Sequence, residues 1–238
     1  MKKHTMATSD VNITMEDTPF MVVEAYKSLR TNLLFAMSTS KRKTIVITSA
    51  QPGEGKSTIA LNLSFVFSEA KYKTLLIDGD FRKPILHKRL KLKNTVGLSN
   101  VLAGFTEENE SIVHYAENLH VIPAGEIPPN PSELLGSPIM EQFLQRMEEK
   151  YDYIVIDTPP SIVVTDSIAV ASLSAGIVLV MREGTTVHPC AEKVLSQMEF
   201  AGIKVLGIVL NNVRGASVSK LGGYKRYSSH LYKQTYGT

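Results

Sequence analysis

Short apolar runs alternate with amphipathic segments along most of this chain. The runs are rich in β-branched residues and predict strands, whereas apolar residues at helical spacing predict the helices between them. Because the runs are apolar throughout, we expect buried strands covered on both faces. The pattern therefore predicts an α/β fold with a mostly parallel sheet and helices on both faces. The expected strands are Thr44–Thr48, Lys73–Asp78, Leu119–Pro123, Tyr153–Asp157, Gly176–Val180 and Lys204–Asn211, and the expected helices are Phe20–Met37, Ser57–Ala70, Ser137–Lys150, Asp166–Leu173 and Pro189–Phe200.

The pattern starts after the N-terminus and stops before the C-terminus. Residues 1–19 are polar and aperiodic, and we expect them to be disordered. Residues 20–40 hold an N-terminal helix, and residues 41–215 form one α/β domain. Residues 216–238 combine glycine and serine with tyrosine and basic side chains, which predicts a flexible tail.

Composition narrows the class of protein. The chain has 238 residues, of which 43% are hydrophobic, enough for one sizeable core. The net charge is only +3, and the basic residues do not form a stripe along one face. Nucleic acid is therefore not an expected partner. The single cysteine, Cys190, rules out a disulfide within the chain. No apolar run approaches the ~20 residues that span a bilayer. We expect a cytoplasmic protein that reaches the inner face of the plasma membrane through a partner.

A phosphate-binding loop follows the first predicted strand. The residues from Ala50 to Ser57 match the P-loop pattern, with alanine in place of its first glycine. Glycines let backbone N–H groups turn toward phosphates, Lys56 reaches the outer phosphates, and the Ser57 hydroxyl ligates Mg²⁺. The loop therefore predicts Mg·ATP binding. The expected ATP-binding residues are Pro52, Gly53, Glu54, Gly55, Lys56, Ser57 and Thr58.

Three carboxylates follow two later strands. Asp78 and Asp80 come after Leu75-Leu76-Ile77, and Asp157 comes after Ile154-Val155-Ile156. An aspartate at the carboxyl end of a strand near a P-loop typically orders Mg²⁺ or its water shell. The alternative, that Asp78 or Asp80 caps the following turn, stays open.

These elements together resemble a known family. The segments Ser49–Ser57, Leu75–Pro84 and Ile154–Pro160 look like its Walker A, Walker A′ and Walker B motifs, and Gly125–Leu135 is similar to a further family marker. The family is the bacterial tyrosine kinases of capsule and exopolysaccharide synthesis, in the form in which the kinase is a separate cytoplasmic chain. The resemblance runs from Phe20 to the C-terminus.

The resemblance implies roles for individual residues. Asp78 and Asp157, with Ser57, would hold Mg²⁺, and Asp80 would activate the tyrosine hydroxyl. The expected catalytic residues are Lys56, Asp78, Asp80 and Arg82. For Arg82, a contact with ATP or the acceptor and a place in a surface basic pair both remain open.

The resemblance also implies partners. One is a transmembrane activator of the polysaccharide co-polymerase, chain-length type, and another is the chain itself, assembled into a homo-oligomer or ring. The ring helix would use Glu24, Lys27 and Arg30. Lys27 stands where the family has arginine, and lysine cannot make the same planar two-point contact with a carboxylate. The helix therefore departs from the family pattern at this position.

Tyrosines cluster at the C-terminal end. Four of the nine lie in the last 15 residues, where they have no core to bury their rings, so we expect them to be phosphorylated by a neighbouring subunit. Other tyrosine-containing proteins would also be substrates. The alternative is a tail that docks on its own domain or on another subunit. The expected autophosphorylation sites are Tyr224, Tyr227, Tyr232 and Tyr236.

Two other functions fit the same P-loop. A switch ATPase of the partition or MinD type shares the fold, but its P-loop carries a second lysine where this chain has Gln51. A nucleotide-binding scaffold without activity would keep the loop and lose the acids, whereas Asp78, Asp80 and Asp157 are all present. The kinase interpretation is therefore favoured.

Overall fold

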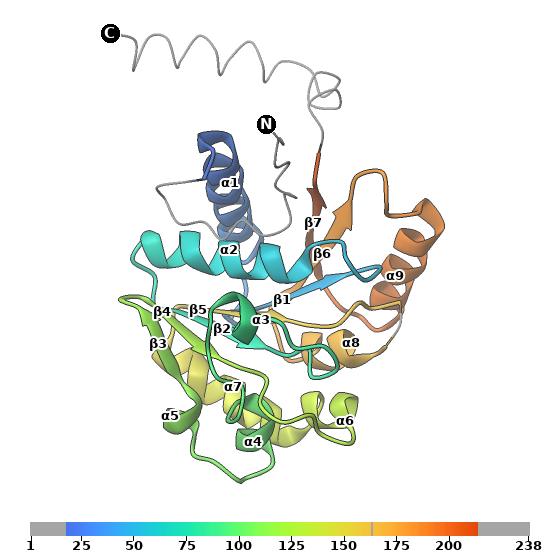
Figure 1. Cartoon of the computed structure of the whole chain (residues 1–238). Helices are drawn as coiled ribbons and strands as arrows, with labels where there is room; N and C mark the ends of the chain where they lie inside the picture. Colours follow the sequence, from blue (N-terminus) through green and yellow to red (C-terminus); the bar gives the residue numbers. More distant parts are fainter. Residues whose placement is uncertain (1–17, 163, 214–238) are drawn as a thin grey trace, which may run out of the picture.

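The structure is a computed structural model that describes residues 18–162 and 164–213. Most of the N-terminal segment predicted to be disordered lies outside the described residues. The predicted tail, with its four tyrosines, lies outside them too. The described residues form a seven-stranded sheet with helices on both faces, which confirms the predicted fold (Figure 1).

The sheet is parallel apart from one edge. Its strands are β1 (Thr44–Ser49), β2 (Thr74–Asp78), β3 (Val113–Ala116), β4 (Leu119–Ile122), β5 (Tyr153–Asp157), β6 (Gly176–Arg182) and β7 (Val205–Asn211). Their order in the sheet is β3-β4-β2-β5-β1-β6-β7, and only β3 and β4 pair antiparallel. The register places Asp78 opposite Asp157, and Asp157 opposite Ile47. The carboxyl ends of β1, β2 and β5 therefore meet at one edge, where ligands bind in such folds.

Helices cover the two faces in separate layers. The helices are α1 (Phe20–Ala36), α2 (Lys56–Glu69), α3 (Leu86–Arg89), α4 (Leu98–Leu102), α5 (Glu108–Ser111), α6 (Pro131–Leu135), α7 (Pro138–Lys150), α8 (Asp166–Ala171) and α9 (His188–Phe200). The helices α1, α2 and α3 pack on one face, and α4, α7, α8 and α9 on the other (Figure 1).

The apolar strands explain this sandwich. Every residue of β1 and β2 is buried, as expected for strands covered on both sides. Phe67 of α2 and Phe143 of α7 are fully buried and belong to the clusters on opposite faces. Burying one such side chain stabilises the fold by about 1.5–3 kcal/mol. Packing on both faces therefore supports the sheet edge at which the strands end.

The two edge strands differ from the sequence prediction. The sequence predicts that Lys204–Asn211 is buried, but in β7 the residues Ile208 and Leu210 are 52% and 51% exposed. An apolar run alone does not distinguish a central strand from an edge strand, which packs on fewer neighbours. The other edge strand, β3, was not predicted, because its exposed His114 and Tyr115 break the apolar pattern.

Candidate functional site

The P-loop lies between the end of β1 and the start of α2. Gly53 and Gly55 adopt φ values of 82° and 97°, in the left-handed region that favours glycine. The helix α2 begins at Lys56, directly after Gly55, so its first N–H groups face the loop. The structure thus confirms the predicted strand, loop and helix arrangement.

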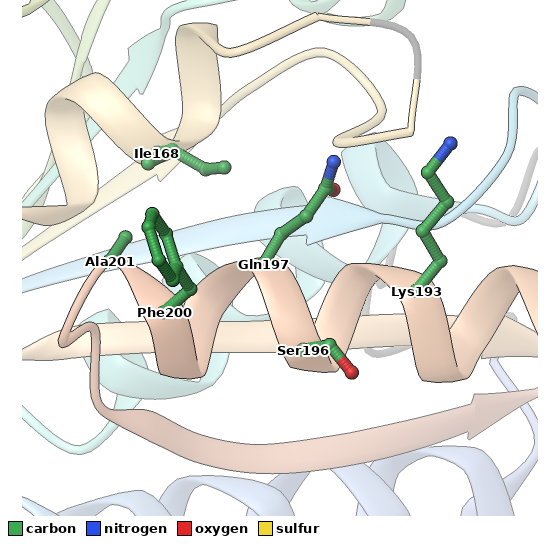
Figure 2. Close-up of a pocket in the computed structure, with 6 residues that line it drawn as sticks. All are labelled: Ile168, Lys193, Ser196, Gln197, Phe200 and Ala201. Carbon is green, nitrogen blue, oxygen red and sulfur yellow. The ribbon is translucent and has the colours of Figure 1, made fainter.

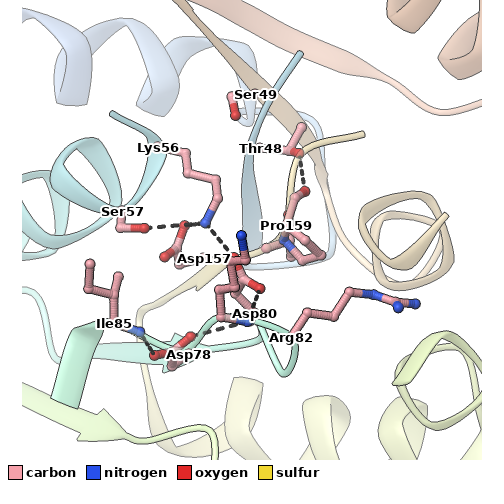
Figure 3. A network of polar contacts seen from close by, with 12 residues as sticks. Thr48, Ser49, Lys56, Ser57, Asp78, Asp80, Arg82, Ile85, Asp157 and Pro159 are labelled. Carbon is pink, nitrogen blue, oxygen red and sulfur yellow. Dashed lines mark hydrogen bonds and ion pairs between the residues drawn. The ribbon is translucent and has the colours of Figure 1, made fainter. Parts of the chain in front are cut away.

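Lys56 reaches across the sheet edge to two carboxylates. Its Nζ lies 2.8 Å from Asp80 Oδ2 and 3.4 Å from Asp157 Oδ1, and it also lies 3.3 Å from Ser57 Oγ (Figure 3). The lysine side chain is only 12% exposed, and the two aspartate side chains are 5% and 0% exposed. Burial lowers the pKa of Lys56, but Asp157 and Asp80 outweigh it and raise that pKa above its ordinary value. Lys56 is therefore a buried ammonium group that faces acids.

Asp78 holds the backbone of the segment after β2, which carries Asp80, through hydrogen bonds. Its Oδ1 accepts the backbone N–H of Asp80 at 3.2 Å, and its Oδ2 accepts that of Ile85 at 3.2 Å (Figure 3). The same Oδ2 also accepts the backbone N–H of Leu86 at 3.1 Å. Burial and the neighbouring Asp157 raise the pKa of Asp78 to about 8. Asp78 thus makes the turn-holding contacts that the sequence left open, while its role toward Mg²⁺ stays a prediction.

Asp157 has the features of a metal ligand. The side chain is fully buried, and burial raises its pKa against the opposing effect of Lys56. Among the described residues, Asp157 Oδ2 has no hydrogen-bond partner. The described residues contain no cluster of three or more ligands that forms a metal cage by itself. Mg²⁺ usually takes one or two carboxylates and completes its shell with phosphates and water, so Asp157 and Ser57 fit that ion.

Arg82 turns away from these acids. Its Nε and Nη2 donate to the two carboxylate oxygens of Asp166 at 2.9 and 3.1 Å. Asp166, on α8, is fully buried and also accepts the hydroxyl of Ser132 on α6. A bidentate pair of this kind holds both partners in one geometry. Through Asp166, Arg82 therefore connects the segment after β2 with α8 and with α6, which lies in the family-marker segment Gly125–Leu135.

The predicted ring residues make contacts within the chain. Lys27 Nζ lies 2.9 Å from Glu24 Oε1 on the same helix, α1. Arg30 Nη1 donates to the backbone carbonyl of Val66 on α2 at 2.5 Å. The Lys27 and Glu24 side chains are 41% and 43% exposed. These two side chains remain accessible to a second subunit, whereas Arg30 also holds α1 on α2.

Two further features are the contact of Thr58, at the start of α2, and a hollow beside α8 and α9. Thr58 Oγ1 accepts a hydrogen bond from Arg89 Nη1 at 2.7 Å. A hollow of about 420 Å³ lies along α9 beside α8, where Phe200 is 96% exposed (Figure 2). It includes none of the predicted site residues. Within the described ranges, no helix is both long and apolar enough to cross a membrane.

Comparisons with known proteins place this geometry in a family. A family model described as an AAA domain matches residues 42–199. Tyrosine-protein kinase YwqD of Bacillus subtilis (strain 168) is 37% identical over 222 residues, which are 93% of this chain and 94% of that protein. The solved kinase domain of Escherichia coli tyrosine kinase ETK matches with a TM-score of 0.81 at 34% identity, covering 90% of this chain and 84% of that chain.

The fold extends beyond such relatives. The septum site-determining protein MinD of Pyrococcus horikoshii OT3, complexed with Mg-ADP, matches with a TM-score of 0.61 at 23% identity, covering 75% of this chain and 76% of that chain. That likeness shows the fold alone. The choice between a tyrosine kinase and a switch ATPase therefore rests on the relatives of higher identity.

Proposed function

The chain belongs to the bacterial tyrosine-protein kinases, and on that premise we propose that it transfers the γ-phosphate of Mg·ATP to tyrosines of its own C-terminal tail, between subunits. The enzyme class, a protein-tyrosine kinase with a nucleotide-binding P-loop, follows from the family. The switch-ATPase alternative is less supported. The proposal concerns the residues that do the chemistry, the tail as acceptor, and a role in regulating capsular or exopolysaccharide synthesis and export.

The observation that carries the proposal is the meeting of Lys56 with two buried carboxylates at the sheet edge. Transfer breaks the bond between the γ-phosphorus and the oxygen that bridges to ADP, and forms a bond from that phosphorus to the tyrosine oxygen. The tyrosine hydroxyl has a pKa near 10 and loses its proton in the transfer. Asp80 accepts that proton, and Lys56 stabilises the charge on the phosphate oxygens.

Magnesium would be held by Asp157 and Ser57, with Asp78 behind them. The ion, when bound, neutralises charge on the β- and γ-phosphates. Asp78 acts mainly by holding the backbone of Asp80, Ile85 and Leu86, which keeps Asp80 beside the phosphates. Arg82 contributes to the same end through its pair with Asp166. We therefore propose positioning roles for Asp78 and Arg82 in addition to any contact with substrate.

Nucleotide competes with Asp80 for the same ammonium group. Lys56 Nζ donates to Asp80 Oδ2 at 2.8 Å, and phosphate oxygens are strong alternative acceptors for that group. As Lys56 turns toward the phosphates, the Asp80 carboxylate is released from its ion pair and can accept the tyrosine proton. Binding of ATP thus prepares the base, which couples nucleotide occupancy to transfer.

The proposed setting follows from the resemblance to the family. We infer a homo-oligomer or ring that uses Glu24, Lys27 and Arg30 of α1. A transmembrane activator of the chain-length type would bring the cytoplasmic kinase to the inner face of the plasma membrane. The acceptors are the four tail tyrosines and tyrosines of other proteins. The tail tyrosines are Tyr224, Tyr227, Tyr232 and Tyr236.

Mixing two variants tests transfer between subunits. One chain carries Lys56→Met with an intact tail, and the other is active but has phenylalanine at the four tail positions. With Mg·ATP and a candidate activator, label should appear on the tail of the Lys56→Met chain. Absence of label, while the wild-type chain labels its own tail, would show that transfer occurs within one subunit.

A further inference from the structure

Side chains from distant segments hold the outer side of the P-loop. Arg182 Nη1, at the end of β6, donates to the carbonyl of Gly53 at 3.0 Å. Asn211 Nδ2, at the end of β7, donates to the carbonyl of Glu54 at 2.9 Å. Both donors lie more than 120 positions further along the chain than the carbonyls they bind. The loop is thus tied to the two strands on the far side of β1.

These two bonds orient two peptide planes. In a trans peptide the carbonyl of one residue and the N–H of the next point in opposite directions. A donor on the outside of the Gly53 carbonyl therefore turns the Glu54 N–H inward, and a donor on the Glu54 carbonyl does the same for the Gly55 N–H. Inward N–H groups are what a phosphate-binding loop requires. The outer bonds consequently act on the inner, ligand-binding face.

A third contact anchors the Glu54 side chain. Its carboxylate is fully buried and accepts the backbone N–H of Gln51 at 2.8 Å and the hydroxyl of Thr186. The Thr186 oxygen in turn accepts the backbone N–H of Arg182 at 2.7 Å. A buried carboxylate requires such partners to offset its lost hydration. The turn after β6 is therefore locked to the P-loop.

Gly55 shows how tightly β7 closes on the loop. A Cβ atom at this position would lie 2.1 Å from Asn211 Nδ2. The same residue has a φ of 97°, which L side chains rarely adopt. Glycine is thus required both by the backbone conformation and by the approach of Asn211. The contact is close enough for a change at Asn211 to alter the loop.

We propose that Arg182, Thr186 and Asn211 are positioning residues that preorganise the P-loop for the phosphates of the nucleotide. They act through Gly53 and Glu54 rather than by contact with the ligand. This inference rests on the proposed nucleotide site and names further residues that set its affinity. Preorganisation removes an ordering cost that binding would otherwise carry.

The test compares ATP with tripolyphosphate, which has the phosphates and no base. Each displaces a fluorescent ATP analogue from the full chain in Mg²⁺. Asn211→Asp keeps the shape of the side chain but replaces its donor with an acceptor, while Thr186→Val removes a hydroxyl and Thr186→Ser retains it. Arg146→Ala is the control, because Arg146 pairs with Glu108 on the surface, away from the loop.

We expect Asn211→Asp and Thr186→Val to lose affinity equally for both ligands. Removing one hydrogen bond should weaken ATP and tripolyphosphate by about 3- to 10-fold, with Asn211→Asp the larger effect. Thr186→Ser and Arg146→Ala should bind as the wild type does, and thermal unfolding midpoints identify variants that fold. Folded Asn211→Asp and Thr186→Val chains with wild-type affinity would overturn the proposal.

If Asn211→Asp weakened the binding of ATP but not of tripolyphosphate, the proposal would also be overturned, because Asn211 would then recognise the base or ribose. A wild-type chain that binds neither ligand contradicts the proposed nucleotide site instead. The two failures are therefore distinguishable.

Discussion

Replacing Lys56 with methionine should destabilise the protein as well as inactivate it. Methionine has a stem of similar length but no charge, so Asp80 and Asp157 lose their common cation. Both carboxylates are nearly or fully buried, at 5% and 0% side-chain exposure. Removing one partner of a buried ion pair typically costs about 3–5 kcal/mol.

Protonation limits this cost. A buried carboxylate that loses its cation can take up a proton, which restores the charge balance of the cluster. For a carboxyl group with a pKa near 4, that uptake costs about 4 kcal/mol at pH 7 and about 2 kcal/mol at pH 5.5. The unpaired carboxyl has a raised pKa in the folded state, so its contribution to stability is lost as pH rises. The penalty of Lys56→Met should therefore shrink by up to about 1.4 kcal/mol for each pH unit of acidification.

Urea unfolding without nucleotide measures this effect. The wild type, Lys56→Met and the exposed control Lys83→Met are unfolded at pH 5.5 and at pH 7, and the free energies of unfolding are compared. We expect Lys83→Met to match the wild type at both values. A Lys56→Met penalty that is absent, or equal at the two pH values, would refute the buried ion-pair account of Lys56.

Two further predictions concern Asp157 and His120. Asp157→Asn should weaken ATP binding in Mg²⁺ on the order of 10- to 100-fold and leave binding in EDTA nearly unchanged, as calorimetry would show; equal losses in both conditions would contradict a metal role. His120 Nδ1 lies 2.7 Å from the Tyr151 hydroxyl, and burial, with His114 and Lys73, lowers the His120 pKa. Its contribution to stability should therefore be lost as pH falls below about 6.5, so thermal unfolding midpoints of His120→Gln should depend less on pH between 7 and 5; an unchanged dependence would contradict it.

The central elements follow from sequence because their signals are local. The run Thr44–Ser49 and the glycines at 53 and 55 together specify a strand, a tight loop and a helix start. The short helices α3 to α6 have four or five residues each, too few for a helical period to be visible. Those elements depend on tertiary packing, which a pattern along the chain does not contain.

The candidate site likewise combines features that the sequence predicts with features that only the structure reveals. Lys56 and the three aspartates are predicted from motif spacing, and the structure brings them to one sheet edge. From the sequence, Lys56 reads as a loop residue, and its burial among acids becomes visible only once β2 and β5 lie side by side. The partners of Arg82 and of the P-loop carbonyls lie 84 to 157 positions away, beyond any local signal. Only the apolar strands, by predicting a common sheet edge, point toward such contacts.

The destination of the γ-phosphate tests the central claim most directly. The purified chain is incubated with Mg·ATP labelled in the γ-phosphate, with and without a candidate membrane activator, and modified residues are mapped by mass spectrometry. The account predicts phosphotyrosine at one or more of the four tail tyrosines, and none in the Lys56→Met chain incubated alone. ATP consumed with release of inorganic phosphate, and no tyrosine modified in the chain or in supplied partners, would contradict it.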